Sequence, residues 1–213
     1  MARANRAWPE LLGSAEEVAP RLLGAVLRHG PVSVRLTEVE AYAGPADPGS
    51  HAFRGPTPRT QVMFGPPGHL YCYFSYGMHV CANIVVGPEG TASAVLLRAG
   101  EVIAGIEQAR ARRATARDRD LARGPARLCR ALGLDLAHGG LPIGRPRSRA
   151  EVTLSIPAGQ SAYDHGPRVG LRRAPDRPWR FWIPGEAAVS DYRRHPRAEP
   201  EGPPDLNPAN GVL

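Results

Sequence analysis

Two glutamates near the end of a predicted strand are the first residues whose types and spacing suggest a chemical role. Glu38 and Glu40 are separated by one residue in LTEVEAYAG, so an uninterrupted strand would present both on one face. Paired carboxylates are typical of glycosidic chemistry, because one group can activate water while the other donates a proton. The apolar alternation slips near Thr37, and a bulge there would separate the pair. An exposed strand edge or an ion pair would explain the same residues without catalysis.

Aromatic residues are concentrated in one segment of a chain that otherwise has few. Four of the first six residues of YCYFSYGMHVCANIVV (71–86) are aromatic, whereas aromatic residues make up 6% of the whole sequence. Tyr71 and Tyr73 share one strand face, and Tyr42 ends the strand that carries Glu40. Tyrosines around a carboxylate would suit a planar guest such as a nucleobase, since stacking a base on an aromatic ring contributes about 1–3 kcal/mol. A hairpin that fills an ordinary core is the simpler alternative.

Core packing does not readily explain the position of Tyr76. The Ser-Tyr-Gly-Met step reads as the turn of a hairpin, and a side chain at a hairpin tip has little core to fill. A tyrosine there has the right shape to enter the space that a flipped base leaves in a duplex. Extracting a base costs a few kcal/mol, which stacking in a pocket could offset. We therefore hypothesise that Tyr76 is a wedge, with hairpin packing as the alternative.

The loop sequence ADPGSHAFRG adds two residues of metal-ligating type, Asp47 and His51. Together with Glu40 they could be drawn as the ligands of a metal-dependent hydrolase. Their spacing matches no established metal motif, and His51 could equally cap a turn or stay in solvent. The sequence therefore assigns no metal site.

The segments that must position these residues read mostly as strands and loops. Strands are expected at 24–28, 32–42, 93–102 and in RPWRFWIPG (177–185), with a hairpin at 71–86, a short helix after Ser14 and helical composition over 101–132. Residues 43–68 form a long irregular stretch, and loops of that length are often functional. Strand–helix–strand alternation is absent, which argues against a doubly wound fold. The sequence predicts an α+β fold: a single mixed domain with a curved, mostly antiparallel sheet, surrounding helices and a protruding β-hairpin.

The length and the apolar pattern set the domain organisation. A chain of 213 residues can bury a substantial core as one domain. We expect that domain to span residues 1–192, and residues 193–213 to form a Pro-rich, disordered tail. No uninterrupted apolar run is long enough to cross a membrane, so no membrane association is expected. The three cysteines lack C-x-x-C spacing, and Cys72 and Cys81, in apolar strand-like sequence, are expected as buried thiols of a cytoplasmic protein.

The charge of the chain favours an anionic partner, and its composition excludes several mechanisms. The net charge is +7, which suits nucleic acid first, then acidic membrane surfaces or phosphorylated metabolites. Every one of the 27 basic residues is arginine. Without lysine the chain has no side-chain amine for a Schiff base and no Walker-type phosphate loop.

The segment TEVEAYAGPADPGSHAFRGPTPRTQVMFGPPGHLYCYFSYGMHVCANIVV, followed by AVLLRA, resembles the alkyladenine (3-methyladenine) DNA glycosylase family of base-excision repair, in its bacterial type. The similarity runs from about Leu22 to Glu107 and continues more loosely through GPARLCRALGL and PRVGLRRAPDRPWRFWIPG. The loop differs from some members in reading T-P-R-T.

The resemblance implies roles for seven residues. Glu40 matches the general base that activates water, and Arg98 matches an arginine near this carboxylate and the target's phosphate. In the base pocket, Tyr42 and His51 match opposite walls and Tyr73 matches another aromatic wall. The remaining two matches are Asn83, which would crowd the exocyclic amine of guanine, and Tyr76, which would intercalate into the DNA.

The function implied by the resemblance is a monofunctional, cofactor-free DNA glycosylase that flips out alkylated or deaminated purines of the 3-methyladenine, hypoxanthine and ethenoadenine class. Its partner would be double-stranded DNA containing damaged purines, bound by a monomer in the cytoplasm at the nucleoid. A monofunctional enzyme uses water and needs no amine nucleophile, which agrees with the missing lysines. A non-catalytic nucleic-acid-binding module with the same aromatic hairpin is the alternative.

Overall fold

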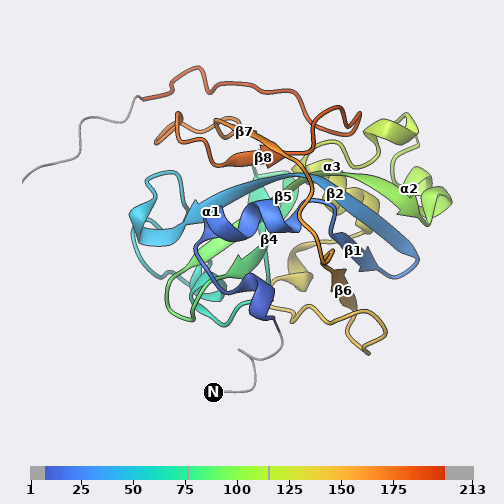
Figure 1. Ribbon diagram of the computed structural model, residues 1–213, viewed down its shortest axis with the longest axis horizontal. Coiled ribbons are helices and arrows are strands. Elements are labelled where there is room, and N and C mark those ends of the chain that lie inside the picture. The colour runs from blue at the N-terminus through green and yellow to red at the C-terminus, as the bar shows by residue number, and fades with distance from the viewer. Residues whose placement is uncertain (1–7, 76, 115, 200–213) are drawn as a thin grey trace, which may run out of the picture.

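One antiparallel sheet organises the part of the chain that the structure describes (Figure 1). The computed structural model describes residues 8–75, 77–114 and 116–199. The sheet has eight strands, and its continuous path is β3-β4-β5-β2-β1-β6, with β8 pairing to β2 and β7 to β8. The strands are β1 (Val26–His29), β2 (Val32–Ala43), β3 (Leu70–Ser75), β4 (His79–Val86), β5 (Ser93–Ala104), β6 (Val152–Ser155), β7 (Asp164–Gly166) and β8 (Arg180–Trp182).

The two longest strands, β2 and β5, form the centre of the sheet, each with 12 residues. Their register shifts between Leu36 and Glu38 and again between Glu38 and Val39. The slip in the apolar alternation near Thr37 is therefore confirmed as a bulge, which bends the strand just before Glu40.

Short helices complete the fold. The α-helices are α1 (Ala15–Val18), α2 (Ile106–Arg112) and α3 (Pro125–Leu132). The 3₁₀ helices are η2 (Pro9–Leu11), η3 (Ala19–Leu22), η4 (Gly44–Ala46), η5 (Gln61–Phe64), η6 (Asp118–Asp120) and η7 (Leu136–His138). The short helix expected after Ser14 is present as α1, which begins with a capping box in which Ser14 and Glu17 satisfy each other's backbone N–H groups. Among the described residues, no helix has the length and apolar character that crossing a membrane requires.

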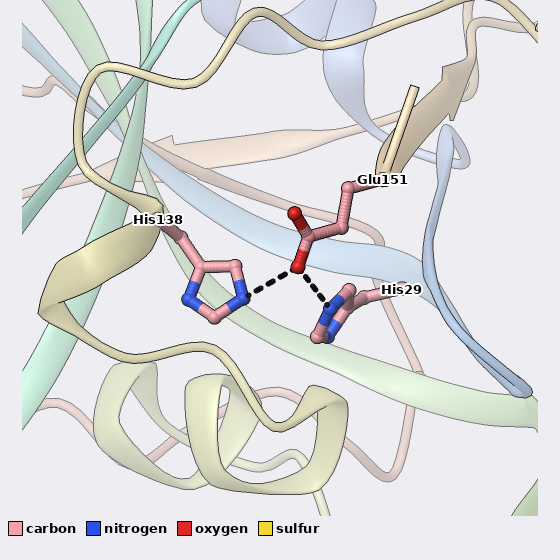
Figure 2. Close-up of side chains that lie close together, drawn as sticks. All are labelled: His29, His138 and Glu151. Atoms are coloured by element: carbon pink, nitrogen blue, oxygen red, sulfur yellow. Dashed lines mark hydrogen bonds and ion pairs between the residues drawn. The ribbon is translucent and has the colours of Figure 1, made fainter. Parts of the chain in front are cut away.

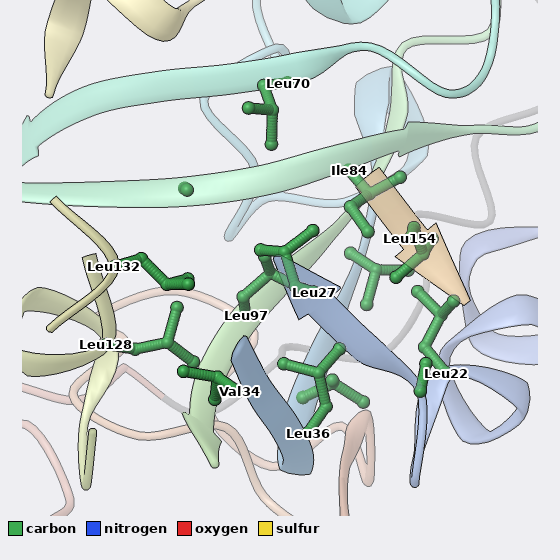
Figure 3. Close-up of a cluster of buried hydrophobic side chains, with 14 of the residues drawn as sticks. Leu22, Leu27, Val34, Leu36, Leu70, Ile84, Leu97, Leu128, Leu132 and Leu154 are labelled. Atoms are coloured by element: carbon green, nitrogen blue, oxygen red, sulfur yellow. The ribbon is translucent and has the colours of Figure 1, made fainter. Parts of the chain in front are cut away.

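Leucine and valine side chains from the sheet and the helices fill the main core (Figure 3). Leu36 and Leu97 on the central strands are fully buried together with Leu128 of α3 and Leu22 of η3. Each such side chain contributes roughly 1.5–3 kcal/mol by leaving water. This core fixes the central strands that carry the polar residues discussed below.

A second, smaller apolar cluster packs the loop that follows β2 against the β3–β4 hairpin. Ala52 and Met63 of the loop are buried with Tyr71 of β3, and Tyr73 packs against them. Gly44 begins this loop with a φ of 56°, and a Cβ there would lie 2.6 Å from the Thr91 carbonyl oxygen. Only glycine fits that turn.

The α+β prediction is confirmed, with corrections in detail. Residues 101–104 continue β5 rather than beginning a helix, and α2 starts at Ile106. The short strands β6 and β7 were not expected. The domain boundary at residue 192 stays a prediction. Just beyond it, the Gly170 N–H donates to the Arg193 carbonyl at 2.8 Å and Arg172 pairs with Glu199.

Candidate active site

A cavity of about 430 Å³ lies over the face of the sheet formed by β2, β3, β4 and β5. Its volume is within the range of small-molecule sites, about 300–1,000 Å³. Among the residues predicted as functional, those that line the cavity are Glu40, Tyr42, His51, Tyr73, Asn83 and Arg98. Tyr76, the predicted intercalating residue, lies outside the described residues.

The floor of the cavity is a row of side chains that follows the strand pairing. Tyr71 pairs with Asn83, Asn83 with Leu96, and Leu96 with Glu40. Cross-strand partners point to the same face of a sheet, and all four residues line the cavity. The register therefore places an aromatic ring at one end of the row and a carboxylate at the other.

The Glu40 carboxylate is fully buried and held by three donors. The Val169 N–H donates to Oε1 at 2.7 Å, the Tyr42 hydroxyl donates to Oε2 at 2.8 Å, and Arg98 Nη1 lies 3.3 Å from Oε1. Burial, followed by the negative charge of Glu40, raises the pKa of Tyr42 well above its usual value. The Tyr42 hydroxyl therefore stays protonated at neutral pH and fixes the orientation of Glu40.

The second carboxylate, Glu38, serves a different purpose. It does not line the cavity; its Oε1 accepts from Arg98 Nε at 2.9 Å and from Arg180 Nε at 2.6 Å, and its Oε2 accepts from the Ser190 N–H at 2.7 Å. Burial alone would lower the pKa of Arg98, but the charges of Glu40 and Glu38 raise it above its ordinary value. The two glutamates therefore contact the same arginine, but only Glu40 lines the cavity.

Three aromatic side chains that line the cavity also contact one another. The His51 and Tyr73 rings meet edge to face with their centroids 4.5 Å apart, and the Tyr71 and Tyr73 rings stack at 5.6 Å. Cys81 lies among them, and burial raises the pKa of its thiol to about 11. The thiol is therefore protonated at neutral pH and is no nucleophile.

His51 is neutral and has a defined hydrogen-bond partner. Its side chain faces the open cavity, and desolvation by the surrounding walls, followed by the charge of Arg59, lowers its pKa to about 4. Arg59 Nε donates to the Tyr71 hydroxyl oxygen at 3.3 Å, and that hydroxyl lies 3.2 Å from His51 Nδ1. In the tautomer where the Tyr71 hydroxyl donates its own proton to Nδ1, the proton of neutral His51 lies on Nε2.

Asp47, proposed as a metal ligand in one alternative, is instead half of a buried ion pair. Arg168 donates to both of its carboxylate oxygens, and the Gly49 N–H donates to Oδ1 at 3.0 Å. The Arg168 guanidinium also lies 4.7 Å from the centroid of the Tyr42 ring. The ion pair therefore holds the loop that carries His51 against the side of the cavity that carries Tyr42. Because both carboxylate oxygens of Asp47 accept from Arg168, the structure does not support the metal-dependent hydrolase.

Sequence reasoning missed three residues that complete the site. Val169 supplies a backbone N–H to Glu40, Arg168 holds Asp47, and Arg59 contacts the hydroxyl of Tyr71. Val169 and Arg168 lie in PRVGLRR, within the segment of looser similarity to the glycosylase family. No side-chain chemistry marks Val169, because a backbone group makes the contact.

Comparison with known proteins adds independent information. A family model described as methylpurine-DNA glycosylase (MPG) matches residues 10–187. Three curated relatives, each named "Putative 3-methyladenine DNA glycosylase", cover most of the chain. The relative from Leifsonia xyli is 55% identical over 87% of this chain and 91% of its own length. Those from Nocardia farcinica and Cutibacterium acnes are each 53% identical, over 89% and 86% of this chain and 92% and 98% of their own lengths.

Proposed function

The chain belongs to the methylpurine-DNA glycosylase family, and on that premise we propose that it is a monofunctional enzyme in which Glu40 activates water to hydrolyse the N-glycosidic bond of a flipped purine. One observation carries the proposal: a buried carboxylate, fixed by three donors, borders a cavity with aromatic walls.

The reaction assigns one proton to Glu40. The oxygen of a water molecule bonds to the anomeric carbon, the bond from that carbon to the purine nitrogen breaks, and its electrons leave with the base. Glu40 accepts a proton from the water, and the product on the DNA is an abasic sugar. A positively charged N-methylated purine leaves as a neutral base, so it needs no strong acid. General-base assistance of this kind is typically worth about 10²–10⁴ in rate.

The aromatic walls of the cavity suit a purine that has been flipped out of the base stack of the duplex. Tyr42, Tyr73 and His51 offer faces and edges at the cavity. Stacking on an aromatic ring contributes about 1–3 kcal/mol per base, comparable with the few kcal/mol that extrusion costs. His51 is neutral, and in the tautomer with its proton on Nε2, where Nδ1 accepts from the Tyr71 hydroxyl, it can donate to an acceptor on the base edge. We assign the base pocket to these three residues.

Asn83 is the proposed discriminator against normal guanine. Its side chain is buried in the floor of the cavity, and Nδ2 donates to the Tyr71 carbonyl at 3.1 Å. That bond fixes the amide, so Asn83 cannot readily turn away from an exocyclic amine at the 2-position of a purine. Adenine, hypoxanthine and their alkylated or etheno forms lack that amine.

The partner of this site is double-stranded DNA containing damaged purines. The net charge of +7 favours binding to the phosphate backbone, and the proposed wedge is Tyr76. We propose that the chain acts on this DNA as a monomer in the cytoplasm. The reaction needs neither a cofactor nor a metal.

A single-turnover excision assay tests the mechanism. Duplexes with one hypoxanthine, one ethenoadenine or only normal bases, and bulk methylated DNA, are incubated with the wild type and with Glu40→Gln, in the presence of a chelator. We expect abasic sites or released methylpurine from the wild type, and a rate constant about 10²–10⁴ lower for the variant with binding retained. Glu89→Gln, at an exposed position, is the matched control.

Two outcomes would change the conclusion. Excision by Glu40→Gln at nearly the wild-type rate would exclude Glu40 as the base. Tight binding of damaged duplexes by the wild type, without release of any base, would favour the non-catalytic nucleic-acid-binding module.

A further inference from the structure

A cluster of two histidines and a glutamate lies at the edge of the sheet formed by β1 and β6 (Figure 2). His29 ends β1, His138 ends η7 and Glu151 immediately precedes β6. In the continuous path of the sheet, β1 and β6 stand at the opposite end from the β3–β4 hairpin that lines the cavity. The cluster is therefore separate from the proposed active site.

One carboxylate oxygen faces both imidazole rings. Glu151 Oε1 lies 3.3 Å from His29 Nε2 and 3.4 Å from His138 Nε2. The rings meet edge to face with their centroids 4.8 Å apart. One ligand atom from each residue can be chosen so that all three lie within 4.8 Å of one another.

The other ring nitrogens have partners that determine where the protons are. His29 Nδ1 lies 2.9 Å from the Leu132 carbonyl oxygen, which can only accept, so this Nδ1 carries a proton. His138 Nδ1 lies 2.7 Å from Asp135 Oδ1 and 3.1 Å from the Asp135 N–H. The shorter, charge-assisted contact with the carboxylate favours a proton on Nδ1 here too. In their neutral forms, both rings then direct the lone pair of Nε2 toward Glu151.

Three electron-rich atoms that face one another repel, and a cation between them would relieve that repulsion. We propose that His29, His138 and Glu151 form a binding site for one borderline divalent transition metal ion of the Zn²⁺ type. Two imidazole nitrogens and one carboxylate oxygen are a ligand set that Zn²⁺ takes in proteins. Ligand atoms about 2.0–2.1 Å from a tetrahedral Zn²⁺ lie about 3.3–3.4 Å apart, which matches both contacts of Glu151 Oε1.

The partners of the histidines also resemble the surroundings of a metal site. Ligating histidines usually donate their second ring N–H to a carboxylate or a backbone carbonyl, which fixes the tautomer. Here the Asp135 carboxylate is the partner of His138 Nδ1, and the Leu132 carbonyl is the partner of His29 Nδ1. A cavity of about 260 Å³ borders the cluster on the side of Glu151; Gly30, Arg28 and Arg147 also line it, and neither histidine does.

The ion would act on the fold rather than on the reaction. It would connect the end of β1 to the end of η7 and the start of β6, which both come much later in the sequence. A metal bound only by the folded chain stabilises it by mass action. Magnesium and calcium, which prefer oxygen ligands, should have no such effect.

Zinc binding by the whole protein tests the proposal without reference to excision. The chain is stripped with chelator, dialysed and titrated with Zn²⁺ alone by calorimetry; Co²⁺ provides a visible spectrum and thermal melts report stability. We expect one Zn²⁺ per chain and a melting temperature that rises with zinc concentration. Glu151→Gln and His138→Gln should weaken binding at least about tenfold, and Asp135→Asn by about 10–100-fold.

Matched controls keep the result interpretable. Glu89→Gln and His165→Gln remove the same chemical groups at exposed positions and should bind zinc like the wild type. Glu151 is largely exposed, so its variant should fold, which circular dichroism verifies. The proposal is overturned by a wild type without saturable zinc binding, or by a Glu151→Gln variant that binds zinc as tightly as the wild type. Either result would leave the cluster as metal-free contacts between the two imidazoles and Glu151.

Discussion

Arg98 Nη1 lies 3.3 Å from the Glu40 carboxylate, and both side chains are buried. The same guanidinium donates from Nε to Glu38 at 2.9 Å. An arginine can make both contacts because its donors form a planar fork, whereas a lysine offers a single point charge. Arg98 therefore couples the proposed base to the network behind it.

Arg98→Lys should keep a positive charge but lose one of the two contacts. We expect single-turnover excision to slow by at least about tenfold, since loss of one positioned donor costs about 10²–10³ in other enzymes. Arg110→Lys, on an exposed arginine that pairs with Glu107 and Asp118, is the control. If Arg98→Lys excises damaged purines as fast as this control, Arg98 only neutralises charge.

Tyr42→Phe separates the two roles proposed for Tyr42. The ring stays available for stacking, but the hydroxyl that donates to Glu40 at 2.8 Å is lost. A hydrogen bond to a charged group contributes about 1.5–3 kcal/mol, so excision should slow by about 10- to 100-fold. Affinity for a damaged duplex should change little, as measured by fluorescence anisotropy. A large loss of affinity with unchanged excision would contradict this division; Tyr163→Phe is the control.

Asp47→Asn tests the buried pair with Arg168. Asn cannot neutralise the guanidinium, and breaking one partner of a buried ion pair costs about 3–5 kcal/mol. For a chain of this size, a change of 1 kcal/mol corresponds to about 2–4 °C in melting temperature, so a decrease on the order of 10 °C is expected. Asp164→Asn, at an exposed position of β7, should melt like the wild type. A variant with unchanged stability would show that Asp47 does not hold the loop.

The parts of the fold that the sequence predicted are those with strong local patterns. The slip at Thr37 marked a real bulge, and the short helix expected after Ser14 is present as α1. The apolar run after Arg98 is compatible with either a strand or a helix. It is a strand up to Ala104 because its backbone pairs with β2. Asp164–Gly166 has no apolar alternation, so β7 exists only because β8 lies beside it.

The site was predictable where a side-chain type identifies its chemistry. Glu40 stood out as a carboxylate in a strand built for burial. Arg168 did not, because it is one arginine among 27 basic residues and only its contact with Asp47 distinguishes it. His29 and His138 are far apart in the sequence and match no metal spacing, so only the folded chain brings them to Glu151.

The neutral state of His51 has a consequence for stability that pH can reveal. Its pKa is about 4 in the folded chain and about 6.5 in an unfolded chain. Between these values the unfolded chain binds more protons than the folded chain, so the free energy of unfolding decreases as the pH falls from about 6.5 toward about 4. His51→Gln removes this difference and should show a shallower decrease in denaturant melts over that range. His165→Gln, at an exposed position, should keep the wild-type slope. Parallel curves for His51→Gln and the wild type would mean that His51 is protonated in the folded chain as easily as in the unfolded one. In that case it could not present a fixed tautomer to a damaged base.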